Sequence, residues 1–489
     1  MTPDPEALAA LARRVRNVRW PDGDAAARAA LAAYETGPRG RTGRAAFAAR
    51  PADTAEVREV VRWAYTHRVP LIPRGGGTGR AAAALPDPSG DQGVLDLTAL
   101  TGAPAIDPDT GTVTAPAGLT VAALLNALSP YGLTLPFAAA PPATPYAPAD
   151  LGGRTVGGLI GDGVSGRRTV PGGGLRSSLL GVAAVLADAG ATPLSMADRG
   201  AFIDSSDPAP LFAGAQGTLG IVTAARFAVV PRPAATAAAI LTFADDTSAL
   251  TLFDALHRAA AHLLTGFEVA ATGFAAAPSA LIRLADPAGD LPVPLGSLLT
   301  TLVTAHAGAA DIAWLGDGDP EPPWPSPDTV TAELARTGTV VELDAIVPRE
   351  RVARLRADTL TLAASTLPGA QVTHLGDALD GRWHLYVTWP YAGAEPEPVQ
   401  LGALIARLHD VVVYAHQGAV AAAYALGPRN QGVHLRLLPP AARRAAARVK
   451  DAFDPRGLLG TPPFGPVHAP VYAGRAGADP RAAWDLGGV

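Results

Sequence analysis

The feature that most constrains the fold of this chain is a glycine-rich stretch at residues 74–80. It reads Arg-Gly-Gly-Gly-Thr-Gly-Arg and follows an extended apolar run at 69–73. Glycine tolerates positive φ and lets successive backbone N–H groups point into one concavity, which suits a phosphate or a diphosphate. A tight loop without a ligand is the alternative interpretation, so the rest of the chain must decide between the two.

The residues before the loop have the order of an α/β nucleotide-binding unit. A strand at 45–49 is followed by a helix at 54–64 with 3.6-residue periodicity, capped by Asp53 or Thr54. The run 69–73 then forms a strand that enters the loop. Strand, helix, strand and glycine loop in this order favour the nucleotide-binding interpretation.

Two more glycine-rich segments follow, and each predicts a close approach of the backbone to another group. Residues 155–166 hold five glycines among apolar residues, and residues 214–220 lead into a strand that ends near Pro231. The composition shifts after Pro231, where we place a domain boundary. Beyond it, we expect strands at 237–243, 266–271, 281–285, 338–346 and 383–389, and helices at 248–263, 348–366, 399–410 and 439–452.

Composition excludes several classes of function. The chain has 489 residues, a net charge of −5 and no basic block, so we expect no nucleic-acid partner. It contains no cysteine, which excludes disulfides, thiolate catalysis, Cys-ligated iron–sulfur clusters and cysteinyl-linked cofactors. We also expect no membrane span and no secretory signal, because the sequence has no 18-residue apolar run and residues 1–20 lack an apolar core. A cytoplasmic location is the resulting expectation.

Four motifs in sequence order resemble the PCMH-type FAD-binding domain of the vanillyl-alcohol-oxidase superfamily. They are VPLIPRGGGTG at 69–79, GTVTAPAGLT at 111–120, TVGG at 155–158 and GTLGIVT at 217–223. The closing segment VKDAFDPRGLL at 449–459 is similar to the end of chains in that family. Within the family, the chain most resembles the glycolate oxidase and D-lactate dehydrogenase group, with a close resemblance across the first half and a weak one across 234–430.

This resemblance implies an α+β fold with a defined domain order. The FAD-binding domain, with N-terminal helices and two α/β subdomains, would occupy residues 1–232. A mixed α+β cap domain that binds substrate would occupy 233–430. Residues 431–489 would return to the FAD-binding domain.

The resemblance also implies how FAD is held. Backbone amides of the first loop would wrap the diphosphate, and the later glycine segments would lie along the cofactor. Arg74 and Arg80 flank the loop, where they could neutralise the diphosphate or remain solvated. The cofactor residues implied are Arg74, Gly75, Gly76, Gly77, Thr78, Gly79, Arg80, Pro136, Thr155, Gly157, Gly158, Gly161, Gly163, Gly217, Thr218, Gly220, Ile221 and Val222. Relatives that attach FAD covalently often carry a histidine near Thr78, so its absence here, with the absence of cysteine, predicts non-covalent FAD.

Oxidation of a 2-hydroxy acid by a flavin needs a cation for the carboxylate and a base for the hydroxyl proton. Related enzymes often carry a Gly-Asp-Gly-Asn-x-His stretch whose histidines act as base or metal ligands. The nearest match here is THLGDALDGRWH, with His374 and His384 ten residues apart. One hypothesis places both histidines at the substrate; the alternative is a β-hairpin turning at Asp380-Gly381 with exposed histidines. His416, in YAHQG, is a third candidate for catalysis, and the sequence leaves a metal site undecided.

The function that these patterns favour is oxidation of a small 2-hydroxy acid, of glycolate or D-lactate type, by hydride transfer to non-covalent FAD. Because the cap motifs depart from the family, a flavin-binding subunit whose chemistry or electron relay lies on a partner chain is an alternative. A nucleotide-binding protein without redox activity is another. Since the chain has no cysteine, electrons would pass to oxygen, a quinone, a soluble acceptor, or a separate subunit bearing an iron–sulfur cluster or other acceptor.

Overall fold

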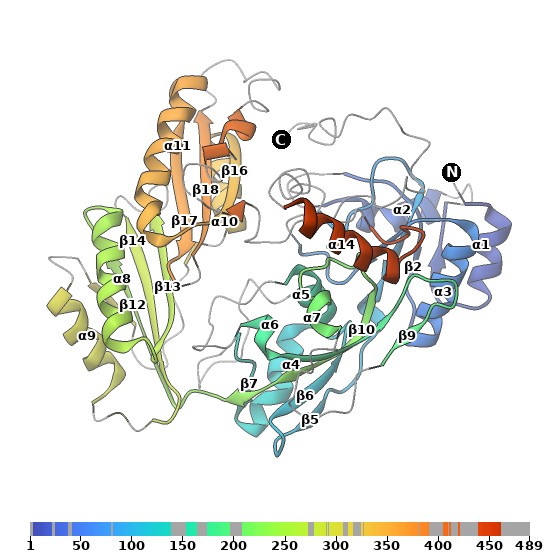
Figure 1. Cartoon of the computed structure of the whole chain (residues 1–489), viewed down its shortest axis with the longest axis horizontal. Coiled ribbons are helices and arrows are strands. Elements are labelled where there is room, and N and C mark those ends of the chain that lie inside the picture. The colour runs from blue at the N-terminus through green and yellow to red at the C-terminus, as the bar shows by residue number, and fades with distance from the viewer. Residues whose placement is uncertain are drawn as a thin grey trace.

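The computed structural model describes a large part of the chain, in segments. These are residues 3–21, 25–37, 42–79, 82–137, 153–163, 174–195, 208–271, 278–289, 291, 293–306, 312–315, 324–325, 327–379, 381–390, 404–408, 410–411, 419–420 and 439–460. In Figure 1, the elements up to β11 (Val230–Pro231) gather on one side with the red helix α14 (Pro440–Phe453). The elements from β12 (Ala235–Thr242) to β19 (Ala419–Val420) form a separate layered body.

The first sheet has four strands in the order β1-β2-β4-β3, and its β2–β4 and β3–β4 pairs are parallel. Asp53 caps the helix that crosses from β2 to β3, because its Oδ1 accepts a hydrogen bond from the Glu56 amide at 2.9 Å. Strand β3 ends at the glycine loop, as the sequence predicts. The elements are α1 (Pro5–Ala12), β1 (Val18–Arg19), α2 (Ala25–Glu35), β2 (Ala45–Ala49), α3 (Thr54–His67), β3 (Leu71–Arg74) and β4 (Gln92–Asp96).

The second sheet has five antiparallel strands in the order β5-β6-β10-β8-β9. Its first hairpin turns at Asp107, whose Oδ1 accepts hydrogen bonds from the amides of Asp109 and Thr110, both at 3.1 Å. A separate short pair joins β7 to β11. The elements are β5 (Ala105–Asp107), β6 (Thr112–Pro116), α4 (Val121–Leu128), β7 (Leu133–Thr134), α5 (Val156–Asp162), α6 (Leu175–Ser178), β8 (Leu179–Val185), β9 (Pro193–Leu194), α7 (Ala209–Phe212) and β10 (Ile221–Ala228).

The third sheet has eight antiparallel strands in the order β15-β12-β14-β13-β17-β18-β16-β19. It begins at Ala235, shortly after the composition shift in the sequence. The elements after β12 are α8 (Asp246–Ala260), β13 (Leu264–Ala271), β14 (Ser279–Asp286), α9 (Leu295–His306), β15 (Ile312–Leu315), α10 (Pro327–Leu334), β16 (Gly338–Ile346), α11 (Val352–Thr366), β17 (Gln371–Asp377) and β18 (Arg382–Pro390). We refer to this sheet and its helices as the cap.

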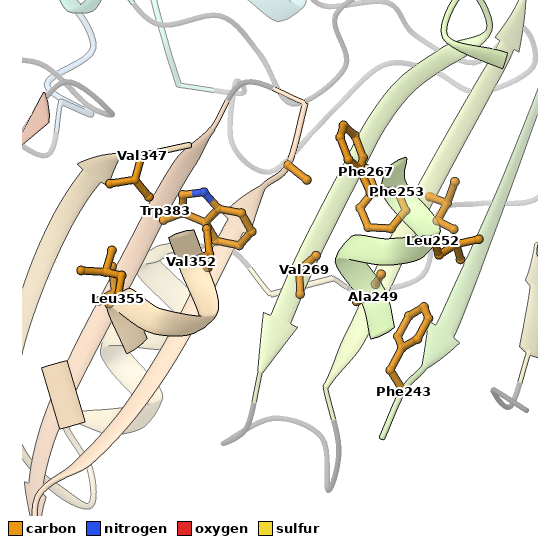
Figure 2. Close-up of a cluster of buried hydrophobic side chains, with 14 of the residues drawn as sticks. Phe243, Ala249, Leu252, Phe253, Phe267, Val269, Val347, Val352, Leu355 and Trp383 are labelled. Carbon is orange, nitrogen blue, oxygen red and sulfur yellow. The ribbon is translucent and has the colours of Figure 1, made fainter. Parts of the chain in front are cut away.

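One face of the cap sheet is covered by α8, α9 and α11 (Figure 1), and the main hydrophobic core lies between them. Figure 2 shows Phe253 of α8 near Phe267 of β13, and the two rings meet edge to face with centroids 5.2 Å apart. Trp383 of β18 lies beside Val352 of α11 in the same view. Among the described helices, none has both the length and the apolar character needed to cross a membrane.

The opposite face of the cap sheet, which we call the inner face, is partly covered by α10. Val330 and Leu334 of this helix pack with Leu375 and Tyr386. The strand register places several buried polar side chains on this inner face, since alternate residues of a strand point to opposite sides. They are Glu268, Arg283, Glu342, Asp344 and His384.

The register of the β17–β18 hairpin separates the two histidines that the sequence suggested for one site. His374 pairs with Leu385, and Leu375 pairs with His384. His374 therefore points toward the helices, whereas His384 points to the inner face. A hairpin of this register cannot bring both rings to one substrate, because a side-chain period of two puts them on opposite faces. The predicted turn is present, with Gly381 at φ +72°, but both histidines are buried rather than exposed.

His374 lies in a buried polar pocket of the helix-covered face. Its Nε2 is 3.6 Å from Asp246 Oδ1, and Arg356 Nη1 donates to Asp246 Oδ2 at 3.1 Å. Among the described residues, neither ring nitrogen has a hydrogen-bond partner. Burial lowers the pKa of His374 to about 4, although Asp246 raises it and Arg356 lowers it further. The ring is therefore neutral at pH 7.

The C-terminal segment returns to the first sheet. The amide of Leu71 donates to Leu458 O at 2.7 Å, and the Gly460 amide donates to Leu71 O at 3.1 Å. Lys450 is 3% exposed. Its ammonium group donates to Asp454 Oδ2 at 2.6 Å and to Thr218 O at 2.5 Å. The last helix is thereby tied to the turn that precedes β10.

Replacing Lys450 with Met should lower the free energy of unfolding by about 3–5 kcal/mol, because Asp454 is then left buried without its counter-ion. Chemical denaturation measures this change. The matched control is Arg444→Met on an exposed position of the same helix, which should cost less than about 0.5 kcal/mol. Equal stability of the two variants would contradict this role of Lys450.

Replacing His374 with Leu should flatten the acid side of the stability profile. The folded pKa of about 4 lies below that of a free histidine, about 6.5, so the unfolded chain binds a proton that the folded protein does not. The wild type should therefore lose up to about 3 kcal/mol more than the variant as pH falls from about 6.5 to 4. Denaturation curves across this range measure the difference. His262→Leu, at an exposed position, is the control. If the free energy of unfolding depends on pH in the same way in His374→Leu and His262→Leu, the buried ring does not affect the pH dependence of stability.

Candidate functional site

A pocket among the described residues lies where the glycine loop meets α5 and the start of β10. The predicted cofactor residues that line it are Arg74, Gly75, Gly76, Gly77, Thr78, Gly79, Thr155, Gly157, Gly158, Gly161, Gly217, Gly220 and Val222. The three glycine-rich segments, far apart in sequence, are thus brought to one cavity.

Four predicted cofactor residues do not line this pocket. Ile221 points to the opposite side of β10 from Val222 and is buried in the core around α3 and β3. Gly163 ends α5 at φ +68°, and Thr218 Oγ1 donates to Ala215 O at 2.7 Å. Pro136 is buried. These four stay predictions that the pocket lining does not include, while Arg80 lies outside the described residues.

Several lining residues were not predicted from the sequence. Most are small or apolar and carry no chemical signature that could have singled them out. Asp162 is different, because it is the one ionisable residue inside the second glycine-rich segment. The unpredicted lining residues are Pro73, Ala83, Ala84, Leu97, Ala117, Asp162, Phe212, Ala215 and Gln216.

The loop after β3 presents its backbone to the pocket. Among the described residues, no acceptor takes a hydrogen bond from the amides of residues 75–79. Successive amides without protein partners are rare in folded proteins unless they face water or a ligand. Because they line one cavity with Gly77 at φ +70°, they fit the predicted diphosphate of FAD.

The glycines of this loop are required first by the protein's own packing. A Cβ atom on Gly76 would lie 1.9 Å from Gly153 O, and one on Gly75 would lie 2.2 Å from Thr155 Oγ1. Any side chain at these positions would push the loop away from the segment that begins α5. The absent side chains therefore bring the two walls of the pocket together, in addition to giving a ligand access to the backbone.

The first amides of α5 are already used by the protein. Thr155 Oγ1 accepts from the Gly158 amide at 3.2 Å, and the amides of Val156 and Gly157 donate to Leu119 O and Ala117 O, both at 2.8 Å. The helix N-terminus therefore offers few free donors to an anion. The amides without an acceptor among the described residues are therefore those of the loop rather than those of α5.

Arg74 holds a positive charge beside the loop. Its guanidinium group donates to Ala84 O and Ala33 O, both at 3.2 Å, and lies over the Tyr34 ring. Burial lowers the pKa of Arg74, with Asp96 and Tyr34 acting in the opposite direction. This arginine is anchored by the protein and lines the cavity, so it can offset anionic charge without moving.

Asp162 brings a carboxyl group into the same cavity. Its Oδ2 is 3.9 Å from Arg154 Nη1 and its side chain is 18% exposed. Burial raises the pKa of Asp162 to about 6, although Arg154 lowers it. A carboxyl group near a phosphate-binding loop is unexpected, because like charges repel.

The inner face of the cap sheet carries a second polar cluster, formed by Glu342, Asp344 and His384. His384 Nδ1 is 2.6 Å from Asp344 Oδ1 and 3.9 Å from Glu342 Oε1. One potential ligand atom from each residue lies within 4.8 Å of the others, so the cluster could hold a divalent cation. Of these three residues, only His384 was predicted from the sequence. Glu342 and Asp344 alternate with apolar residues in the expected strand at 338–346, and this alternation was the signal for a shared face.

The other sequence candidates do not join this cluster. His374 lies on the opposite face of the sheet, and His416 lies outside the described residues. Glu268 and Arg283 form a separate buried ion pair on the inner face. His384 is therefore the predicted catalytic histidine that the structure places among other polar groups of the inner face.

Two families match this sequence. Residues 45–192 match a family described as FAD binding domain, and residues 324–461 match FAD linked oxidases, C-terminal domain. The first match includes the glycine loop and the start of α5, and the second includes the cluster on the inner face and the returning C-terminal segment.

Among curated proteins, the chain is similar to D-2-hydroxyglutarate dehydrogenase of Bos taurus, at 25% identity over 85% of this chain and 76% of the relative. It is also similar to glycolate oxidase subunit GlcD of Bacillus subtilis, at 29% identity over 37% of this chain and 36% of the relative. D-lactate dehydrogenase of Archaeoglobus fulgidus is 28% identical over 37% of this chain and 38% of the relative.

Solved structures with the same fold extend over most of the chain. Alkyldihydroxyacetonephosphate synthase has a TM-score of 0.67 at 15% identity, covering 93% of this chain and 84% of that chain. p-Cresol methylhydroxylase has a TM-score of 0.67 at 14% identity, covering 92% of this chain and 94% of that chain. With both family matches and the loop geometry, these similarities confirm the predicted α+β fold and FAD as the cofactor. The chain thus has an FAD binding domain and the C-terminal domain of FAD linked oxidases, and it is an FAD-dependent oxidoreductase.

Proposed function

We propose that this protein oxidises a small 2-hydroxy acid by hydride transfer to non-covalently bound FAD. The observation that carries the proposal is the pocket whose wall is the loop 75–79, with amides that have no acceptor among the described residues. The substrate class is supported by relatives that include D-2-hydroxyglutarate and D-lactate dehydrogenases. Because the similarity to D-2-hydroxyglutarate dehydrogenase extends over 85% of this chain, a D-2-hydroxy dicarboxylate joins glycolate and D-lactate as a candidate.

Non-covalent retention of FAD follows from the residues around the loop. Thr78 stands where a tethering histidine would be needed, and the chain has no cysteine. The loop amides would bind the diphosphate, with the fixed charge of Arg74 beside them. The apolar side chains of Leu97, Phe212 and Val222 would shield the bound cofactor from water.

The inner face of the cap supplies the proposed proton acceptor. If Nδ1 of His384 carries the proton and donates to Asp344, its Nε2 holds the lone pair and can take the proton of the substrate hydroxyl. FAD, when bound, supplies the acceptor for the hydride of the α-carbon. Arg382 shares the face of His384 on β18 and is the proposed cation for the substrate carboxylate.

A methyl group on the wall of the pocket should weaken FAD binding without harming the fold. Gly161→Ala places a Cβ 3.6 Å from Gln216 Cα, an ordinary contact, and alanine favours a helix more than glycine does. We expect the dissociation constant for FAD to rise at least about tenfold, that is, by about 1.4 kcal/mol, in fluorescence titrations.

Gly296→Ala is the matched control, because α9 offers an open position with nothing within 4 Å of the added Cβ. It should bind FAD as tightly as the wild type. Equal affinities of all three proteins would mean that the cofactor does not touch the α5 wall.

Anaerobic mixing with D-2-hydroxyglutarate, D-lactate or glycolate should bleach the visible absorbance of the flavin, and the L-enantiomers of the first two should do so far more slowly. His384→Gln should retain FAD but bleach about 10²–10⁴-fold more slowly, the range for loss of a general base. His262→Gln, on the exposed surface, is the control. Absence of bleaching with every 2-hydroxy acid tested would overturn the proposed substrate class and favour the alternative of a flavin-binding subunit.

An electron-accepting partner chain and a cytoplasmic location stay predictions.

A further inference from the structure

Asp162 is the feature of the pocket that cofactor binding alone does not explain. It is the last residue of α5, and its side chain lines the cavity opposite the glycine loop. A Cβ on Gly79 would lie 3.2 Å from Asp162 Oδ1 and 3.6 Å from Oδ2. The carboxyl group therefore lies against Gly79, at the end of the loop whose amides have no acceptor among the described residues.

Among the described residues, the carboxyl group of Asp162 has few polar partners. Arg154 Nη1 is 3.9 Å from Asp162 Oδ2, which is too long for a hydrogen bond. The buried Nε of Arg154 also has no hydrogen-bond partner among the described residues. An ionised carboxylate with so few donors is poorly stabilised at a site that is 18% exposed.

Among the described residues, Arg154 is the charged side chain that acts on Asp162, and Arg74 lines the same cavity. Arg154 comes from the segment before α5, and Arg74 comes from the end of β3. The turn at 213–217 contributes no ionisable residue, and neither do residues 83–84. Arg74 donates to the carbonyl groups of Ala33 and Ala84, so neither arginine forms a hydrogen-bonded ion pair with Asp162.

A diphosphate held by the loop would place negative charge beside this carboxyl group. Two anions at close range in a partly buried site cannot both remain ionised without a large cost, and the weaker acid takes the proton. We propose that Asp162 is a cofactor-binding residue that takes up one proton when FAD binds, so that the neutral carboxylic acid donates a hydrogen bond to a diphosphate oxygen. This inference rests on the binding of FAD in the pocket, and the proton comes from solvent.

The free protein is poised for this proton uptake, since burial raises the pKa of Asp162 to about 6. A neighbouring diphosphate raises it further. FAD binding should therefore weaken as pH rises above about 6, by at most tenfold in dissociation constant per pH unit, and level off above the pKa of the complex.

The test is a titration of protein stripped of FAD between pH 5.5 and 8.5, followed by flavin fluorescence. The wild type should bind FAD more weakly as the pH rises above 6, until its dissociation constant levels off. Asp162→Asn keeps a hydrogen-bond donor and cannot ionise, so its affinity should be independent of pH and exceed that of the wild type at pH 8. Asp109→Asn removes the same charge from an exposed turn and should keep the wild-type profile.

Two further measurements need no variant. Calorimetry at pH 7 in two buffers of different ionisation enthalpy should detect net proton uptake on binding of FAD. Riboflavin lacks the diphosphate, so its binding should cause no net proton uptake. No proton uptake with FAD, or a wild-type pH profile that persists in Asp162→Asn, would overturn the role of Asp162 and leave the proposed function intact. Failure to bind FAD at any pH would overturn both.

Discussion

The close contact between the first glycine loop and the segment before α5 is the constraint on which the cofactor site depends. Gly76 packs so tightly on Gly153 that a Cβ would lie 1.9 Å from its carbonyl oxygen. This contact joins the four-stranded sheet to the five-stranded sheet at the pocket. Since the first amides of α5 are used internally, the loop is the wall whose amides have no acceptor among the described residues. The shape of the candidate cofactor site is thus set by backbone packing as much as by chemistry.

The cap follows a second constraint, the alternation of side chains in its sheet. Helices α8, α9 and α11 require one apolar face, so the polar residues of β13, β16 and β18 gather on the other. A shift of one residue in the β17–β18 register would exchange His374 and His384. The observed register therefore places the buried, neutral His374 on one face of the sheet and His384, which is oriented by Asp344, on the other.

Much of the fold was predictable because its signals are local. Asp53 at a helix N-terminus, Asp107 in a hairpin turn and the apolar periodicity of 54–64 each act within a few residues. The loop glycines were predictable for the same reason. The face of the cap sheet on which His374 and His384 each lie was not predictable. The register of this hairpin depends on the turn between its two strands and on the pairing of β18 with β16. Asp162 could have been noticed, yet its pKa depends on Arg154 and on burial, which no local pattern reveals.

The return of the C-terminal segment has a consequence for the order in which the protein is made. Strand β3, which leads into the loop, forms hydrogen bonds to Leu458 and Gly460, and the buried ammonium of Lys450 binds Thr218 O beside the pocket. Domains generally fold from the N-terminus as the ribosome releases them. Here the wall of the candidate site remains without its supporting C-terminal segment until residue 460 has left the ribosome. A truncated product would therefore carry every glycine of the site and still lack the support that holds them in place.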